Sequence, residues 1–180
     1  GHLVAKYLKE VEHVSMVFTI SGGHIENILD GFTEYGIRTI DVRHEQAGAM
    51  MAHAWSIYKK EPGVCLVTAG PGFTNALTGI ANAFLDNVPL VVLCGRHPLR
   101  DDLTGALQEM NQIDMVKPVT KWCATCYDTK RIPEYLSIAF RQATMGRPGP
   151  VFLELPPDIL FVPVDEKTVN MPVRRVHKSS

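Results

Sequence analysis

The sequence predicts an α/β protein with a doubly wound, six-stranded, mainly parallel sheet that carries helices on both faces. Two observations predict this fold. Short apolar runs bounded by turn residues alternate with longer segments of helical periodicity along most of the chain, as they do in chains built from β-α-β units. The 180 residues, of which 46% are hydrophobic, are enough to fill the core of one ordinary domain. Right-handed crossovers would then bring the carboxyl ends of the strands to one edge of the sheet.

The elements follow one another in a regular order. Strands are expected at residues 14–20, 37–42, 64–68, 90–94, 119–126 and 151–155. Helices are expected at residues 3–10, 25–35, 45–59, 74–85 and 132–145. Pro156 and Pro157 end the last strand, and the segment from residue 161 to residue 180 has no clear period. We therefore divide the chain into a domain of residues 1–160 and a linker or tail of residues 161–180 that leads towards an absent middle domain.

Charge and hydropathy exclude two classes of partner. The formal net charge is −1 and the basic residues are dispersed, so no continuous positive stripe is available to bind nucleic-acid phosphates. The longest apolar run, residues 88–94, contains Pro89 and is far shorter than the roughly 20 residues that a membrane-spanning helix needs. We expect neither nucleic acid nor a membrane to be a partner.

The cysteines indicate a reducing compartment. Cys65, Cys94, Cys123 and Cys126 lie mainly in apolar, strand-like stretches, which is typical of small buried thiols and not of a disulfide framework. Cys123 and Cys126 have the spacing of a redox or zinc pair, but residues three apart in an extended segment point to opposite faces. We therefore predict a cytoplasmic protein with no metal ligand in this chain.

Glu45 stands where the strand expected at residues 37–42 gives way to a helix. The carboxyl end of a parallel strand opens onto the crevice in which α/β proteins bind ligands. The glycine-rich segments 21–24 and 68–75 are expected at the same edge, where glycine lets a ligand approach the backbone closely. Each feature alone also suits a plain structural role, with Glu45 as a helix-start acid and the glycines as tight turns.

Three sharper motifs do not fit this edge. His44 and Glu45 begin like a zinc-protease helix, but Gly48 stands where the second histidine ligand would be. The segment 70–75 begins like a dinucleotide-binding loop, yet Asn75 replaces the third glycine. No Walker A sequence is present.

Four ordered segments resemble one known family. They are Ser21-Gly22-Gly23-His24, Arg43-His44-Glu45-Gln46-Ala47-Gly48, Thr68-Ala69-Gly70-Pro71-Gly72-Phe73-Thr74-Asn75 and Leu107-Gln108. Together they are similar to the pyrimidine-binding, N-terminal domain of thiamine diphosphate-dependent enzymes of the acetolactate synthase, benzaldehyde lyase and 2-hydroxyacyl lyase type. The resemblance covers residues 1–160.

The resemblance implies a role for each matching residue. Glu45 would hydrogen-bond N1′ of the cofactor's aminopyrimidine and pass a proton to and from it. Gly22, Gly23, Thr68, Pro71, Gly72 and Asn75 would also lie close to thiamine diphosphate. His24 and Gln108 would face a small 2-oxo or 2-hydroxy substrate. Acetolactate synthases usually have proline where Ser21 stands, and pyruvate decarboxylases have adjacent histidines where Ala106 and Leu107 stand. The choice among C–C bond lyase, carboligase and 2-oxo acid decarboxylase therefore stays open.

The resemblance also implies partners. In this family a Gly-Asp-Gly motif binds the divalent metal of the cofactor diphosphate, and it does not occur in this sequence. The Mg2+ ligands are therefore expected in an absent diphosphate-binding domain or subunit. The chain would be an N-terminal half-site that forms a dimer or tetramer and is inactive in isolation. The alternative interpretation is a non-catalytic module, either a flavodoxin-like binder of an anion or nucleotide or a dimer-assembly domain.

Overall fold

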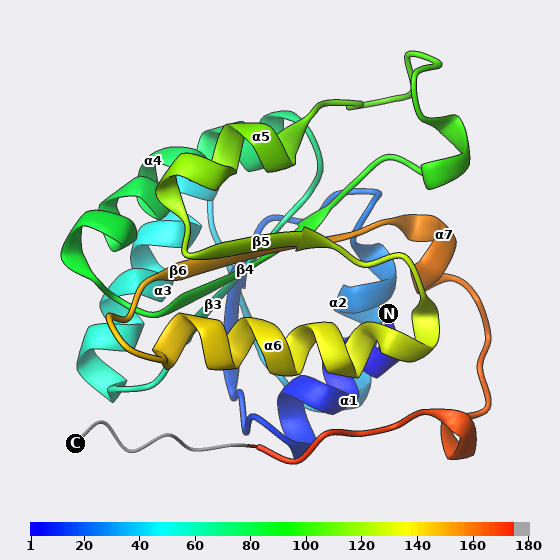
Figure 1. Ribbon diagram of the computed structural model, residues 1–180, viewed down its shortest axis with the longest axis horizontal. Helices are drawn as coiled ribbons and strands as arrows, with labels where there is room; N and C mark the ends of the chain where they lie inside the picture. The colour runs from blue at the N-terminus through cyan, green and yellow to red at the C-terminus, as the bar shows by residue number, and fades with distance from the viewer. Residues whose placement is uncertain (175–180) are drawn as a thin grey trace.

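The computed structural model describes residues 1–174 and contains one six-stranded sheet between two layers of helices (Figure 1). The strands are β1 (Met16–Thr19), β2 (Arg38–Asp41), β3 (Gly63–Val67), β4 (Leu90–Gly95), β5 (Trp122–Thr125) and β6 (Pro150–Leu155). Their order in the sheet is β2-β1-β3-β4-β6-β5, and every neighbouring pair is parallel. The predicted doubly wound α/β fold is confirmed.

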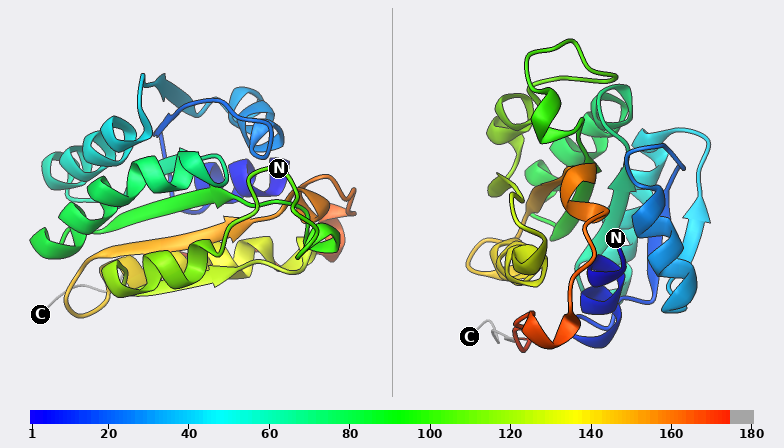
Figure 2. Two further views of the ribbon diagram at one scale, coloured as in Figure 1. Left: turned by 90° about the horizontal axis from the view of Figure 1, so that it is seen from above. Right: turned by 90° about the vertical axis from the view of Figure 1, so that its right-hand side faces the viewer.

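Helices cover both faces of this sheet. They are α1 (His2–Glu10), α2 (Glu26–Glu34), α3 (Glu45–Lys59), α4 (Pro71–Asp86), α5 (Gln112–Val116), α6 (Ile132–Thr144) and α7 (Pro157–Leu160). One layer contains α1, α2 and α6, and the opposite layer contains α3, α4 and α5 (Figures 1 and 2). The loop between β4 and α5 projects beyond the carboxyl edge of the sheet (Figure 1).

The alternation of side chains along each strand sorts the core into two clusters. In β3, Val64 and Leu66 pack with the residues of α1, α2 and α6, whereas Cys65 and Val67 pack with those of α3 and α4. Every residue of β3 and β4 is buried, as expected of central parallel strands that are covered on both faces. The sheet edge that carries the loops is therefore anchored on a rigid, fully packed centre.

Two element boundaries differ from the sequence-based expectation by three residues, and the others differ by two at most. The helix α4 begins at Pro71 and not at residue 74, because proline suits the first helical turn and Gly70 before it adopts φ +60°. The strand β5 begins at Trp122 and not at residue 119, because Lys117–Val119 forms a 3-10 helix. The sequence patterns also miss the short helices α5 and α7.

The segment that follows α7 packs back onto the domain. Three of its hydrophobic side chains contact the core cluster of α1 and α6, namely Val164, Val169 and Met171. Lys6 of α1 donates a hydrogen bond to Glu166 at 2.5 Å. Figure 1 shows this orange and red segment passing below α1. Residues 161–174 of the expected linker or tail therefore lie against the domain, whereas residues 175–180 are outside the described residues.

The cysteines are distributed over both cores. Cys126 belongs to the cluster on the α6 side, and Cys123 packs against the cluster on the α4 side, so this pair does point to opposite faces of the sheet. All four cysteines are free thiols. Over residues 1–174, the apolar length of every helix falls short of what a bilayer crossing requires.

Candidate functional site at the carboxyl edge of the sheet

The carboxyl edge of the sheet gathers the loops that follow β1, β2 and β3. Because β1 lies between β2 and β3, the connection out of β1 and the connection into β3 run to opposite sides of β1. Open α/β sheets bind ligands in the crevice that such a switch point creates. The loops that border the crevice here occupy residues 20–25, 42–44 and 68–70.

Glu45 is the first residue of α3 and is half-buried. Its carboxylate is held from the neighbouring helix, because Asn75 Nδ2 of α4 donates a hydrogen bond to Glu45 Oε2 at 2.9 Å. The N-cap of α3 is His44, whose Nδ1 accepts from the Gln46 amide at 3.2 Å. Within residues 1–174, Asn75 provides the single hydrogen bond to the Glu45 carboxylate. Oε1 is therefore left for a ligand or for water.

Two glycines lie against the Thr68 side chain, and one of them, Gly72, also lies beside the Glu45 carboxylate. A Cβ on Gly22 would lie 2.6 Å from Thr68 Cβ, and a Cβ on Gly72 would lie 2.7 Å from Thr68 Cγ2 and 3.4 Å from Glu45 Oε1. Any side chain at either position would collide with the Thr68 side chain. Gly23, in contrast, has no atom within 4 Å of its Cβ position and faces open space. At Gly72, main chain without a side chain therefore lies beside the Glu45 carboxylate.

His24 and Gln108 flank the same turns. His24 Nδ1 lies 3.4 Å from Thr68 Oγ1. Gln108 lies against Gly70, whose Cβ would be 2.9 Å from Gln108 Cβ. Burial lowers the pKa of His24, and the side chain of Gln108 partly offsets this effect. The imidazole is therefore favoured in its neutral form, which offers one donor and one acceptor nitrogen.

The structure brings the predicted site residues together at one edge. A continuous series of contacts joins Glu45, Asn75, Gly72, Thr68, Gly22 and His24. Gln108 adjoins this series at Gly70, and the exposed residues Gly23 and Pro71 lie on the same two loops. A carboxylate with one open oxygen beside flat backbone can exchange a proton with a ring nitrogen of a planar heterocycle.

Comparison with known proteins identifies the family. Residues 1–115, more than half of the chain, match the model of the family described as thiamine pyrophosphate enzyme, N-terminal TPP binding domain. The chain belongs to the thiamine pyrophosphate enzymes. The matched residues include β1 to β4 and every loop of the edge described above.

Several thiamine pyrophosphate enzymes and related proteins are similar over most of this chain. Acetolactate synthase large subunit IlvG of Mycobacterium tuberculosis is 40% identical over 161 residues, which are 89% of this chain and 29% of that protein. Acetolactate synthase isozyme 3 large subunit of Escherichia coli is 45% identical over 150 residues, 82% of this chain and 26% of that protein. Human 2-hydroxyacyl-CoA lyase 2 is 37% identical over 161 residues, 89% of this chain and 25% of that protein. The chain thus spans between 25% and 29% of the length of these relatives.

One feature of this edge suits the aminopyrimidine half of thiamine pyrophosphate. Asn75 holds the Glu45 carboxylate on the side of α4 through Oε2, and Gly72 carries no side chain beside Oε1. Within residues 1–174, the one group of three side chains able to share a metal ion consists of His97, Asp102 and Glu109. That group lines a different cavity. Among residues 1–174, no group of three possible metal ligands lies beside Glu45.

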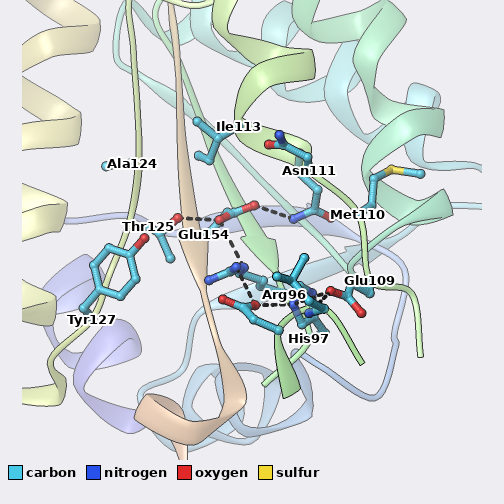
Figure 3. Close-up of a pocket in the computed structure, with 13 residues that line it drawn as sticks. Arg96, His97, Glu109, Met110, Asn111, Ile113, Ala124, Thr125, Tyr127 and Glu154 are labelled. Carbon is cyan, nitrogen blue, oxygen red and sulfur yellow. Dashed lines mark hydrogen bonds and ion pairs between the residues drawn. The ribbon is translucent and has the colours of Figure 1, made fainter. Parts of the chain in front are cut away.

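This second cavity has a volume of about 590 Å³ and opens at the carboxyl ends of β4, β5 and β6 (Figure 3). Because β6 is inserted between β4 and β5, this is a second switch point of the sheet. Its polar lining includes Arg96, Gln112, Thr125 and Glu154, and its apolar lining includes Met110 and Ile113. Figure 3 shows Glu154 joined by dashed lines to the polar side chains around it.

The acidic groups of this cavity are already engaged. The Oδ1 atom of Asp102 lies 2.5 Å from His97 Nε2 and 2.8 Å from Arg96 Nη2. The Glu109 carboxylate accepts hydrogen bonds from three backbone amides of the projecting loop, those of Leu103, Gly105 and Ala106. This cluster is therefore built as a set of ion pairs and turn-closing hydrogen bonds that shape the loop.

Sequence reasoning missed Arg96, Gln112 and Glu154. One signal was available, since Glu154 is a charged residue inside the apolar run of β6 and is only 2% exposed. A buried carboxylate requires partners. The identity of those partners depends on strand order, which periodicity does not give.

Proposed function

We propose that this chain is the N-terminal half-site of a thiamine diphosphate-dependent enzyme that makes or breaks C–C bonds, as a lyase, a carboligase or a 2-oxo acid decarboxylase. The observation that carries the proposal is the Glu45 carboxylate beside bare backbone, held by Asn75 at 2.9 Å. Membership of the thiamine pyrophosphate enzymes supports the choice of cofactor. When bound, the cofactor supplies the electron sink that C–C bond cleavage requires.

Glu45 is the proposed catalytic residue of this chain. It holds and releases a proton at N1′ of the aminopyrimidine, and Asn75 orients its carboxylate by donating to Oε2. Gly22, Gly23, Thr68, Pro71 and Gly72 are proposed to lie beside the ring, and the three glycines place no side chain there. Proton transfer by a positioned side chain of this kind contributes about 100-fold to 10,000-fold to a rate.

His24 and Gln108 are proposed to face the substrate. Both flank the turns beside Glu45, and the pKa of His24 is lowered by burial, so its neutral imidazole can donate to or accept from a carbonyl or hydroxyl group. The names of the relatives, acetolactate synthase and 2-hydroxyacyl-CoA lyase, support a small 2-oxo or 2-hydroxy compound as substrate.

The remaining half of the active site is proposed to come from another segment or subunit, together with the Mg2+ ligands. The lengths of the relatives support this, because the chain matches no more than 29% of any of those compared above.

We further propose a homodimer or homotetramer formed through this domain. Exposed apolar side chains of α3 and α4 support such an interface, namely Met50, Met51, Ile57, Tyr58 and Leu85.

We also propose a reducing compartment such as the cytoplasm. The four free thiols support this proposal, although the Arabidopsis thaliana relative is named as chloroplastic.

The decisive experiment substitutes Glu45→Gln in the full-length protein that contains this chain and measures C–C bond cleavage or carboligation with thiamine diphosphate and Mg2+. The substitution keeps the shape of the side chain and removes its titratable proton. We expect kcat to fall by about 100-fold to 10,000-fold. Glu26→Gln is the matched control, because Glu26 is an exposed acid in the first turn of α2.

Equal activity of the Glu45→Gln variant and the wild-type enzyme would contradict the proposal and leave Glu45 as a simple helix-start acid. The 180-residue chain alone should bind thiamine diphosphate weakly and turn over no substrate. Carboligation by the purified chain would contradict its role as a half-site.

A further inference from the structure

A buried carboxamide connects the second cavity to the Glu45 site. Gln112, the first residue of α5, is only 1% exposed. Its Oε1 accepts a hydrogen bond from the Gly70 amide at 2.8 Å, and its Nε2 donates to Glu154 Oε1 at 2.8 Å and to the Gly95 carbonyl at 3.1 Å. One side chain thus joins the carboxyl ends of β3, β4 and β6.

The orientation of this carboxamide is fixed by its neighbours. A carboxylate oxygen can only accept and a backbone amide can only donate, so the Gln112 oxygen must face Gly70 and its nitrogen must face Glu154. Glu154 is fixed in turn, because Thr125 Oγ1 donates to Glu154 Oε2 at 2.5 Å and Arg96 Nε lies 3.7 Å from the same oxygen. Figure 3 shows Glu154 between Thr125 and Arg96 in this cavity.

The far end of the network is the turn that begins α4. Gly70 has φ +60° and ψ −114°, a conformation that is open to glycine and strongly disfavoured for other residues. Its amide would be an unpaired buried donor without Gln112. The two residues of α4 that contact Glu45, Gly72 and Asn75, follow within the next five positions. A shift of the Gly70 turn would therefore displace both of them relative to the carboxylate.

We propose that Gln112 and Glu154 form a positioning pair for the Glu45 site: from the opposite half of the sheet edge they fix the Gly70 turn and, through it, the placement of Gly72 and Asn75 against Glu45. Neither residue touches the carboxylate, so both act through Gly70. The inference rests on the proposed proton-transfer role of Glu45 for its effect on activity. Its structural part, the link between Gln112 and the Gly70 turn, is independent of that role.

Gln112→Glu is the decisive variant. The new carboxylate still accepts from the Gly70 amide, but its second oxygen meets two acceptors, Glu154 Oε1 and the Gly95 carbonyl, where the wild-type nitrogen donated. Glu154→Gln is the conservative control, because its oxygen can still accept from Gln112 and the Thr125 hydroxyl can accept from its nitrogen. In the double variant Gln112→Glu/Glu154→Gln the donor and acceptor are exchanged, and the bond between the two positions is restored.

The test uses the full-length enzyme that contains this chain and three measurements. These are kcat/KM with thiamine diphosphate, the affinity of the cofactor-free enzyme for thiamine diphosphate, and hydrogen exchange of the peptide that contains Gly70. A misplacement of about 1 Å at a catalytic group can cost about 100-fold in rate, so we expect a loss of about this size for Gln112→Glu. For the same variant we expect weaker cofactor binding and faster hydrogen exchange at Gly70. Glu154→Gln should have only a small effect on all three measurements, and the double variant should recover most of the activity.

Two results would overturn the proposal. The first is a folded Gln112→Glu enzyme whose kcat/KM and whose hydrogen exchange at Gly70 both equal those of the wild-type enzyme. The other is a folded double variant that is no more active than Gln112→Glu. If Gln112→Glu does not fold, Thr125→Val replaces it, because loss of the hydroxyl frees Glu154; unchanged Gly70 exchange and kcat/KM in that variant would equally contradict the pair.

A parallel Glu45→Gln enzyme separates this inference from the proposed function. If Glu45→Gln retains activity, the proton-transfer role is wrong, and Gly70 exchange still tests the link to Gln112. If Glu45→Gln is inactive while Gln112→Glu behaves as wild type, the positioning pair alone is wrong.

Discussion

Asn75 of α4 donates a hydrogen bond to the carboxylate of Glu45 at the start of α3, at 2.9 Å between Nδ2 and Oε2. The contact joins two helices that pack side by side on one face of the sheet. Their close approach is possible because residue 79 is glycine. A Cβ at this position would lie only 2.6 Å from Ala49 Cβ. The contact therefore reports on how accurately α3 and α4 are placed relative to each other.

The first prediction concerns Asn75→Asp. This change replaces the donor by a second carboxylate beside Glu45, so two like charges face each other at neutral pH. We expect the free energy of unfolding of the cofactor-free protein to fall by about 1 to 3 kcal/mol, towards the lower figure because both side chains are partly exposed. Urea unfolding at pH 7 measures the change. The loss of unfolding free energy relative to the wild-type protein should become smaller as the pH falls, because protonation of one carboxyl group recreates a donor.

Asn75→Ala is the matched control, because it removes the donor without adding a charge. Its effect on the unfolding free energy at pH 7 should be smaller than that of Asn75→Asp. If Asn75→Asp and Asn75→Ala were equally stable at pH 7, the contact with Glu45 would not be formed in solution.

The second prediction compares adjacent glycines. Gly22→Ala introduces a methyl group 2.6 Å from Thr68 Cβ, whereas Gly23→Ala introduces one into open space. Overpacking of this kind costs about 1 to 3 kcal/mol, so Gly22→Ala should lower the unfolding free energy of the cofactor-free protein and Gly23→Ala should leave it almost unchanged. If Gly23 lies beside the cofactor as proposed, Gly23→Ala should still weaken thiamine diphosphate binding. Wild-type affinity of that variant would remove Gly23 from the proposed site.

Much of this edge could be predicted from the sequence for a simple physical reason. Buried apolar runs mark the parallel strands, and the carboxyl ends of parallel strands share one edge. The loops with Gly22, Glu45 and Thr68 had to meet there once the strands were recognised, and the structure brings them within contact distance. The chemical roles of these residues are not given by that convergence, and they stay predictions.

The rest depends on features that periodicity does not encode. The Gln112 to Glu154 hydrogen bond joins residues 42 positions apart and forms because β6 is inserted between β4 and β5. The projecting loop contains Leu103 with φ +65° and Gln108 with φ +59°, which residue propensities disfavour for side chains with a Cβ. Local hydrogen bonds from three backbone amides to the Glu109 carboxylate close this loop and offset those propensities.

The third prediction tests this closure by pH. Hydrogen bonds from the backbone amides of the loop, that of Leu103 foremost, lower the pKa of Glu109. A carboxyl group whose pKa is lower in the folded protein stabilises the fold above its unfolded pKa of about 4.3 and loses this contribution as the pH falls through the folded value. Hydrogen exchange at Leu103 to Ala106, corrected for intrinsic rates, should therefore be slow above about pH 5 and accelerate below about pH 4.

Glu109→Gln should raise exchange in the same loop above about pH 5, because an amide offers one acceptor oxygen where the carboxylate offers two, and the two proteins should converge at low pH as Glu109 becomes protonated. Glu61→Gln, at an exposed acid in the turn before β3, is the control and should leave the loop unchanged. A loop that exchanges equally in the wild-type protein and in Glu109→Gln would show that the carboxylate does not close it.

The fourth prediction concerns the order in which the thiols react. Burial raises the pKa of the Cys65 thiol to about 12, with a further contribution from the nearby Glu45 charge, and burial raises the pKa of Cys126 to about 11. The thiolate is the reactive species, so alkylation by iodoacetamide at pH 8 should be slow at both. Cys123 is only partly buried and should react first, giving one fast thiol per folded chain and four after unfolding in urea.

Cys123→Ser should remove the fast phase and leave the slow ones unchanged. Because Cys123 and Cys126 belong to cores on opposite faces of the sheet, mild oxidation of the folded protein should not join them. A disulfide between them would require β5 to leave the sheet, since opposite faces of a strand keep the two sulfur atoms apart. Recovery of that disulfide from folded protein would therefore contradict the position of β5 beside β6.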